Sequence, residues 1–218
     1  MNNNFEPIRI RAYLQSGVIS GQFLPLDGVI YYQLMREAFG ENVYSLPNEV
    51  NLPSAHSITL PFSIENEGSE DWFYKCSFAQ WSAEVIEDQQ TYSKRFDLSR
   101  SGIVDFGKKK AHVDNQRGTY KSYHVKVYYR HSNFVDWYAV GNMQELEKIL
   151  PFCTHLGKKV SQGWGAVLKW EVTPWEHDWS IYANSKLMRA IPTTSHGFIY
   201  GIRPSYWLPA NQVNCILP

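Results

Sequence analysis

One stretch of the chain, residues 154–172 (THLGKKVSQGWGAVLKWEV), combines residue types that suit phosphate binding. Its glycines lack a Cβ, so the backbone can adopt positive φ and bring N–H groups against a ligand. Consecutive N–H groups form an anion-binding concavity, adjacent lysines add attractive charge, and a partly exposed tryptophan offers a ring for base stacking. We predict positive φ at Gly163 or Gly165, and a binding loop made of Gly157, Lys158, Lys159, Ser161, Gln162, Gly163, Trp164 and Gly165.

This stretch differs from the phosphate loop of a nucleotide hydrolase. The pattern G-x-x-x-x-G-K-[ST] is absent, and the glycines precede a predicted strand at residues 166–172, whereas that motif follows a strand. From the local residues alone, a tight turn with ordinary solvated lysines explains the stretch equally well.

A second feature is a basic segment hidden in a chain of zero formal net charge. Residues 94–130 contain ten Lys or Arg and three acidic residues, a net charge of +7. Gly102, Gly107 and Gly118 and the scarcity of large apolar residues in its first part predict a projecting loop or long hairpin at residues 94–118. A solvated charged face is the simpler interpretation, whereas RNA contact would use Lys108, Lys109, Lys110, Arg117, Lys121 and Tyr123.

Candidate catalytic groups are sparse. Metal-free RNA cleavage needs a base near the attacking 2′-hydroxyl, and only His112 and His124 lie among suitable basic and aromatic neighbours. A lone histidine beside lysines is more often an RNA or solvent contact than a base. The irregular spacing of the acids at 71, 84, 87 and 88 indicates a solvated surface. We therefore expect no catalytic residue, no metal and no cofactor.

Strands and helices that would position these residues can be predicted from apolar periodicity. Residues 8–14 alternate apolar side chains with Arg9 and Arg11, which predicts a half-buried strand with a basic outer face. Residues 120–130 and 135–140 also read as strands. Asp27 is expected to cap a first helix that ends near Gly40, and Asn142 a second helix that Pro151 shortens.

Composition limits the class of protein. The 218 residues are 44% hydrophobic and 15% aromatic, which indicates a folded core. Three widely spaced cysteines support neither a disulfide framework nor a zinc site. No run of eighteen apolar residues occurs, so we expect a cytoplasmic protein that does not contact a membrane.

Three sequence blocks carry a family resemblance: residues 16–37, residues 154–172 and, more loosely, residues 117–127. Their order resembles the RAMP proteins of CRISPR systems, and more narrowly the Cas-five family subunit of type IV effector complexes. The resemblance implies an α+β fold with a ferredoxin-like (RRM/RAMP) antiparallel sheet over residues 1–173. The basic segment 94–118 would be an inserted thumb-like hairpin, and the irregular, aromatic-rich residues 174–218 an extension packed on the same domain.

The resemblance also implies a function. The chain would be a noncatalytic subunit that caps the 5′ handle of the guide RNA (crRNA), beside backbone RAMP subunits and a large subunit, and would meet target DNA only through the complex. From the charge and the glycines of residues 94–130 we further expect this segment to be mobile in the free subunit and ordered by RNA. The RNA would pass between Lys108–Lys110 and the glycine stretch, with Lys121 and Tyr123 on the flanking strand. Two alternatives stay open: a metal-independent endoribonuclease that processes precursor crRNA, and a protein-interaction module without RNA contact.

Overall fold

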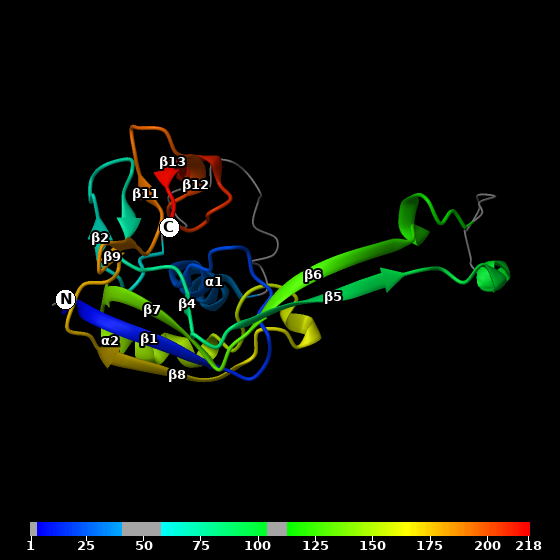
Figure 1. Cartoon of the computed structure of the whole chain (residues 1–218), viewed down its shortest axis with the longest axis horizontal. Helices are drawn as coiled ribbons and strands as arrows, with labels where there is room; N and C mark the ends of the chain where they lie inside the picture. Colours follow the sequence, from blue (N-terminus) through cyan, green and yellow to red (C-terminus); the bar gives the residue numbers. More distant parts are fainter. Residues whose placement is uncertain (1–3, 41–57, 104–112) are drawn as a thin grey trace.

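The computed structural model describes residues 4–40, 58–103 and 113–218. Its central element is an antiparallel sheet with the strand order β4-β7-β1-β8 (Figure 1). The strands are β1 (Glu6–Leu14), β4 (Gln80–Trp81), β7 (Phe134–Gly141) and β8 (Val167–Pro174). The strands predicted at residues 8–14, 135–140 and 166–172 are therefore confirmed, as is the α+β class with an antiparallel sheet.

Alternation along β1 defines the two faces of this sheet. Ile8, Ile10 and Ala12 are buried in the main core, whereas Arg9 and Arg11 point to the opposite face and are partly exposed. A strand with one buried face must place alternate residues on its other side. The predicted basic outer face of this strand is thus confirmed.

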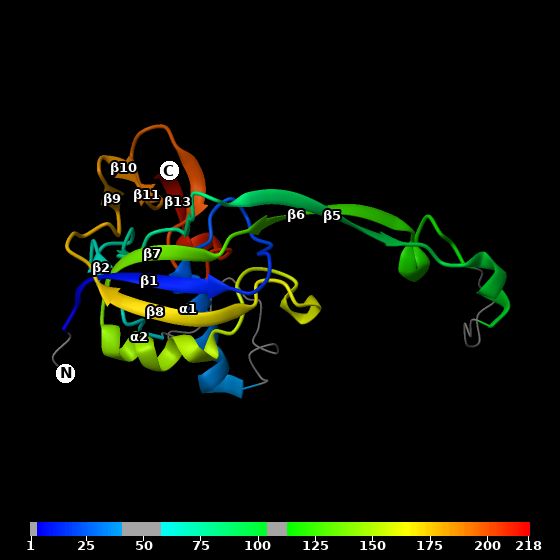
Figure 2. The same ribbon diagram turned by 60° about the horizontal axis from the view of Figure 1, so that its bottom comes forward.

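Two helices cover the buried face, and both lie on the same side of the sheet (Figure 2). Helix α1 (Leu26–Phe39) ends at Gly40, whose φ is 55°, as predicted. Helix α2 (Met143–Ile149) begins at Asn142, whose side chain accepts a hydrogen bond from the Glu145 N–H at 3.2 Å. A short 3₁₀ turn (Leu150–Phe152) that contains Pro151 follows, so the predicted cap and the predicted shortening are both confirmed.

The prediction that Asp27 caps α1 is wrong. Pro25 occupies the N-cap position, and Asp27 lies inside the first turn, where only 1% of its surface is exposed. Its carboxylate oxygens accept the hydroxyl of Tyr206 at 2.6 and 2.8 Å, and one also accepts the Gly28 N–H at 2.9 Å. The side chain therefore joins the helix to the C-terminal part of the chain.

Burial raises the pKa of Asp27, although nearby Arg189, the Tyr206 hydroxyl and backbone N–H groups oppose this. The folded protein then holds this proton more tightly than the unfolded chain does. The stabilising contribution is full below about pH 4 and is lost as pH rises through the folded pKa. We expect the wild type to lose stability relative to Asp27→Asn between pH 3 and pH 8, measured by urea unfolding of both proteins. A relative gain instead would show that Arg189 keeps Asp27 ionised.

The C-terminal part contains only short strands, and three of them form a sheet of order β11-β13-β12. Its strands are β11 (Ile191–Pro192), β12 (Phe198–Gly201) and β13 (Gln212–Ile216), beside the pair β9 (Tyr182–Ala183) and β10 (Lys186–Leu187). Arg189 is fully buried and donates to the carbonyl oxygens of Tyr74, Cys76 and Ile202. These bonds tie the extension to the strand pair β2 (Ile64–Glu65) and β3 (Phe73–Tyr74).

A two-stranded arm projects far from the body (Figure 1). It is built from β5 (Ile86–Lys94) and β6 (Tyr123–His131), and we call residues 86–131 the arm. A projecting hairpin therefore exists, but its paired strands are residues 86–94 and 123–131, not the predicted 94–118. That range lies beyond the paired strands, with a 3₁₀ helix at Leu98–Ile103, and its residues 104–112 lie outside the described residues. Both faces of β5 are largely exposed, so its sequence IEDQQTYSK lacks the apolar alternation that marks a half-buried strand.

Candidate nucleic-acid interface

The glycine loop, residues 157–165, connects the turn after α2 to β8. Gly157, Gly163 and Gly165 have φ values of 78°, 85° and 71°, and Lys159 has a φ of 57°. The predicted positive φ is therefore confirmed at both Gly163 and Gly165. Such backbone geometry is ordinary for glycine and strained for most other residues.

Close packing explains two of the three glycines. A Cβ at Gly157 would overlap the carbonyl oxygen of Ile19, and one at Gly165 would overlap that of Leu156. A Cβ at Gly163 would meet nothing within 4 Å. Gly157 and Gly165 thus allow the loop to lie directly against its neighbours, and only Gly163 faces open space.

The loop does not present the expected concavity of free N–H groups, because four of its backbone N–H groups already donate hydrogen bonds within the protein. Lys158 N–H donates to the Ile19 carbonyl at 2.7 Å, and Gly165 N–H to the Gly17 carbonyl at 2.8 Å. The N–H groups of Gln162 and Gly163 donate within the loop, at 2.9 and 3.0 Å. Anion attraction at these positions must come from the lysine side chains.

A second loop, residues 16–20, lies between the glycine loop and the arm. Ser16 Oγ donates to the Gly163 carbonyl at 2.8 Å and accepts the Ala166 N–H at 2.9 Å. On its other side, Val18 exchanges two backbone hydrogen bonds with Arg130, at 2.9 and 3.0 Å. This segment belongs to the block of residues 16–37 that carries the family resemblance, but its contacts with the glycine loop and with the arm were not predicted.

Trp164 is partly exposed, as predicted, but it is not a free stacking platform. Its Nε1–H donates to the hydroxyl of Tyr92 at 2.8 Å, and its ring lies 4.6 Å from that of Tyr129. Both tyrosines belong to the arm. The indole therefore fastens the glycine loop to the arm, through a hydrogen bond between residues 72 positions apart.

The lysines of the loop are the accessible charges. Lys158 and Lys159 are exposed, and neither forms an ion pair within the described ranges. Lys159 Nζ lies 4.2 Å from the centroid of the Tyr92 ring, a cation–π distance that leaves its charge uncompensated. These two ammonium groups suit a phosphate.

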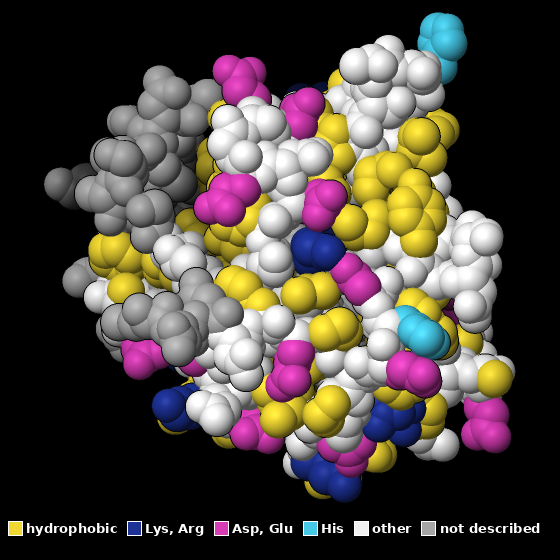
Figure 3. Space-filling view, turned by 90° about the vertical axis from the view of Figure 1, so that its left-hand side faces the viewer, with side chains coloured by type: hydrophobic (Ala, Val, Ile, Leu, Met, Phe, Trp, Pro, Cys, Tyr) yellow, Lys and Arg dark blue, Asp and Glu magenta, His cyan; other side chains and the backbone are white. Residues whose placement is uncertain are grey.

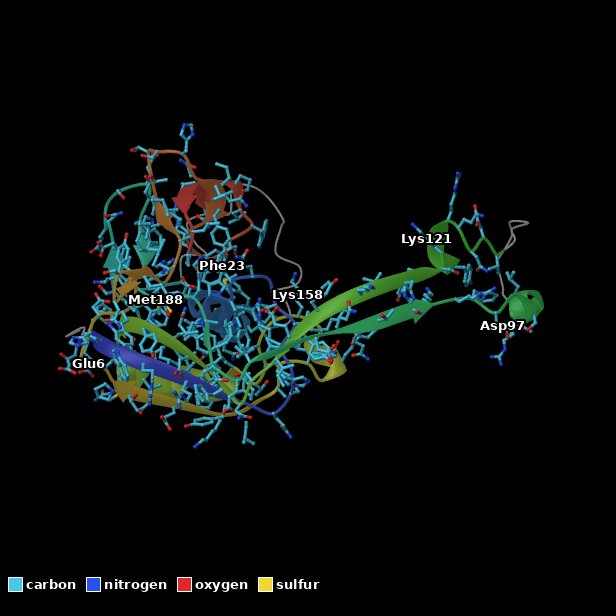
Figure 4. The ribbon with its side chains drawn as sticks, in the orientation of Figure 1. Glu6, Phe23, Asp97, Lys121, Lys158 and Met188 are labelled. Carbon is cyan, nitrogen blue, oxygen red and sulfur yellow. The ribbon has the colours of Figure 1, made fainter. Side chains whose placement is uncertain are left out.

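The predicted site residues fall into two places. Figure 4 shows Lys158 at the base of the arm and Lys121 towards its far end, with Asp97 farther out. Tyr123 pairs with Lys94 at that same far end of the hairpin, close in sequence to Arg117 and Lys121. The predicted contacts Lys108, Lys109 and Lys110 lie outside the described residues, as does His112. The two groups are therefore at different positions along the arm, although Tyr92, which contacts Trp164 and Lys159, lies only two residues from Lys94.

Strand register divides the arm into two faces. Tyr92 and Tyr129 contact Trp164 and therefore face the glycine loop. Tyr123, Val125 and Val127 lie on the same face, because they follow at every second residue from Tyr129 along β6 and Val125 pairs with Tyr92. Tyr123 and Val125 are 49% and 48% exposed. Exposed rings beside cations are the surface on which single-stranded nucleic acid stacks.

His124 lies on the other face of the arm. Its Nδ1 is 2.8 Å from Ser93 Oγ, the residue directly opposite in the hairpin. The glycine loop is thus on the far side of the strand from this imidazole. Nδ1 of His155 lies 3.0 Å from Thr154 Oγ1, a hydrogen bond to its neighbour in the chain.

Arg130 fixes the base of the arm from that second face. Its Nε donates to Glu87 at 2.7 Å, and its Nη1 donates to the Gly21 carbonyl at 3.2 Å. It adjoins a hollow of about 520 Å³ that also contains Asp88. The pKa of Asp88 is lowered because its carboxylate accepts the Gln89 N–H and the Tyr129 hydroxyl. This hollow is therefore partly acidic and does not suit a phosphate.

Replacing Trp164 with leucine is expected to loosen the arm. The variant loses the hydrogen bond to Tyr92 and the ring contact with Tyr129, together worth roughly 1–2 kcal/mol of local opening free energy. Amide hydrogen exchange in β5 should accelerate by about tenfold. Trp207→Leu, a change at an indole that is 58% exposed in the C-terminal part, is the control. Equal exchange in the two variants would contradict the fastening role.

The end of the body opposite the arm has a different character. Figure 3 views this end, where acidic side chains are scattered among apolar ones and Lys and Arg form only small isolated patches. Within the described ranges, no group of three or more His, Cys, Asp or Glu could hold a metal ion. In the same part of the chain, no helix is both long and apolar enough to cross a membrane.

Together the fold and the site define an α+β protein with a projecting arm and, at the base of that arm, a lysine-bearing glycine loop. The chain belongs to the family of the CRISPR type IV associated protein Csf3, whose family profile matches residues 6–218. It is therefore a component of a type IV CRISPR effector complex, and other subunits of such a complex are its partners. No curated protein matches the chain.

Proposed function

We propose that this subunit binds the guide RNA, without catalysing a reaction on it, and caps the 5′ handle of that RNA in a type IV ribonucleoprotein. The observation that carries the proposal is the joint between the glycine loop and the arm. Lys158 and Lys159 stand uncompensated where Trp164 meets Tyr92, so a phosphate backbone and exposed rings would be held at one place.

The strand order supports a RAMP identity for the domain. Along the chain, β1, β4, β7 and β8 are the first, second, third and fourth strands of this sheet, so their spatial order β8-β1-β7-β4 reads 4-1-3-2. Helices α1 and α2 fall after the first and the third of these strands. A β-α-β-β-α-β chain with this antiparallel order is the arrangement of a ferredoxin-like domain.

The arm would then act as the thumb over the RNA. Its strands carry Lys94, Lys126 and the exposed rings of Tyr123 and Tyr128, and its far end carries Arg117 and Lys121. Backbone RAMP subunits and the large subunit would be the neighbours, target DNA would be reached through the complex, and the complex would work in the cytoplasm against foreign DNA.

The test is a complex reconstituted with guide RNA that carries 4-thiouridine at single positions of the handle. We expect crosslinks from the handle to the glycine loop and to the arm, mapped by mass spectrometry of the peptides. Crosslinks of the handle to other subunits only would overturn the proposal and would leave this chain as a protein-interaction module.

A separate assay tests the proposal that the subunit does not cleave RNA. Incubation of the subunit with repeat RNA in the presence of EDTA is expected to leave the RNA intact. Cleavage that is abolished by His124→Ala or by His112→Ala would instead make the chain an endoribonuclease. The contact of His124 with Ser93, on the face turned away from the glycine loop, argues for the first result.

A further inference from the structure

The face of the central sheet opposite α1 and α2 carries an ordered row of rings and cations. Strand register places Tyr13 of β1 between Phe134 of β7 and Lys169 of β8. Arg11, two residues before Tyr13, points to the same side because Ala12 points into the core. We call these four side chains the open-face row. In Figure 1 both helices lie behind the sheet, so this face is turned towards the viewer.

Cations lie against the rings along this row. Lys169 Nζ is 4.3 Å from the Tyr13 ring centroid, and Arg11 Cζ is 3.7 Å from that of Phe134. Two hydrogen bonds of 2.7 Å join the Arg11 guanidinium to Asp136, which raises the pKa of Arg11 and holds the group in place. One side of the guanidinium lies on Phe134 and 19% of the side chain is exposed, so a nucleobase would stack on the remaining side as it does on a ring.

One charge in the row has no counter-ion. Arg11 pairs with Asp136, and Arg9 farther along β1 pairs with Glu171 at 3.1 Å. Lys169 is exposed and makes no ion pair in the part of the chain that the structure describes. Its ammonium group is therefore available for a phosphate beside the stacking surface.

The row lies at the end of the sheet that adjoins the glycine loop. At the other end, Tyr138, Trp175 and Trp179 pack together with ring centroids 5.0–5.3 Å apart and cover the sheet. A hollow of about 370 Å³ begins next to the row, and its lining includes Leu14, Ser16, Glu84, His131 and Asn133. Ser16 also bonds to Gly163, so the hollow reaches from the row to the glycine loop.

We propose that the open-face row is a second binding site for single-stranded RNA, in which a base stacks on Arg11 and Tyr13 and Lys169 receives a phosphate. The strand held by the glycine loop continues through the hollow onto this face. The inference rests on the proposed RNA binding for the identity of the strand, and it adds a site that neither the glycine loop nor the arm provides. A protein partner on this face would leave Lys169 unpaired unless it brought an acid.

The experiment uses the full chain and a uridine-rich RNA of about 20 nucleotides that contains 4-thiouridine. We expect crosslinks to the peptides of Tyr13 and Phe134. Affinity, measured by fluorescence anisotropy, should fall about tenfold in Tyr13→Leu/Lys169→Ala, which corresponds to the loss of one stacked base and one phosphate contact. Tyr13→Phe should bind as the wild type does, because it keeps the ring.

Lys148→Ala is the matched control, because this exposed lysine lies on α2, on the helix side of the sheet. Lys169→Glu covers the case in which the double variant fails to fold, since it alters only an exposed side chain. Affinity in Lys169→Glu equal to that in Lys148→Ala, with no crosslink at Tyr13 or Phe134, would overturn the inference. Crosslinks to the glycine loop without crosslinks to the row would overturn only the proposed site at the row. Crosslinks to the row that persist in Lys158→Ala/Lys159→Ala would support that site even if the glycine loop does not bind RNA.

Discussion

Gly165→Ala is expected to destabilise the protein by at least about 2 kcal/mol, with a fall in Tm of roughly 4–8 °C or more. Two effects add at this position. The φ of 71° disfavours any side chain, and a Cβ would overlap the Leu156 carbonyl oxygen. Because the Gly165 N–H also bonds to Gly17, the strain would displace residues 16–20 and the base of the arm.

Two other glycines separate these effects. Gly163 has a φ of 85° but open space around it, so Gly163→Ala should cost only about 1 kcal/mol. Gly102 has neither positive φ nor a neighbour within 4 Å, so Gly102→Ala should change stability little. In thermal unfolding, the Tm of Gly165→Ala should be the lowest, that of Gly163→Ala intermediate and that of Gly102→Ala the highest. Equal Tm values for Gly163→Ala and Gly165→Ala would show that the loop relaxes around the added methyl group.

Much of the central sheet could be predicted because one of its faces is buried. That burial produces the alternation of Ile8, Ile10 and Ala12 with Arg9 and Arg11 along β1. The alternation was sufficient to predict the strand and its basic face correctly. Strand β5 escaped prediction for the converse reason. Both of its faces meet solvent, so no burial constrains which of its side chains are apolar.

Long-range partners decided what the local patterns could not. Asp27 has the residue type of a helix cap, but Tyr206, 179 positions away, draws it into the interior. Trp164 has the setting of an exposed platform, but Tyr92 and Tyr129 of the arm hold it. The positive φ at Gly163 and Gly165 was predictable because it depends on the residues of the loop alone.

The guide-RNA assignment itself depended on the order of three sequence blocks, since local chemistry left an ordinary turn equally open. The structure shows that two of these blocks, residues 16–37 and 154–172, are in direct contact. Residues 16–20 form backbone bonds with the glycine loop on one side and with Arg130 of the arm on the other. Three segments far apart in the chain thus form one joint.

Lys158→Ala/Lys159→Ala is expected to weaken RNA retention while the fold stays intact. Both side chains are exposed, and neither has an ion pair within residues 4–40, 58–103 and 113–218, so their removal leaves no buried charge behind. If each contacts one phosphate, the slope of log affinity against log salt should become shallower by roughly 1.4–2 units. The loss of affinity should be largest at low salt, where the release of each counterion into dilute solution contributes most to the free energy of binding.

The control must remove the same charge elsewhere. Lys148→Ala/Lys186→Ala also lowers the net charge by two, at exposed lysines on α2 and β10. If general attraction of the protein for a polyanion were responsible, the two double variants would shift the slope equally, and the loop would lose its special role. Lys159→Arg tests whether Lys159 binds RNA while its charge lies against the Tyr92 ring. Arginine keeps both the charge and a cation–π contact with Tyr92, so binding should be retained if Lys159 acts while held against that ring.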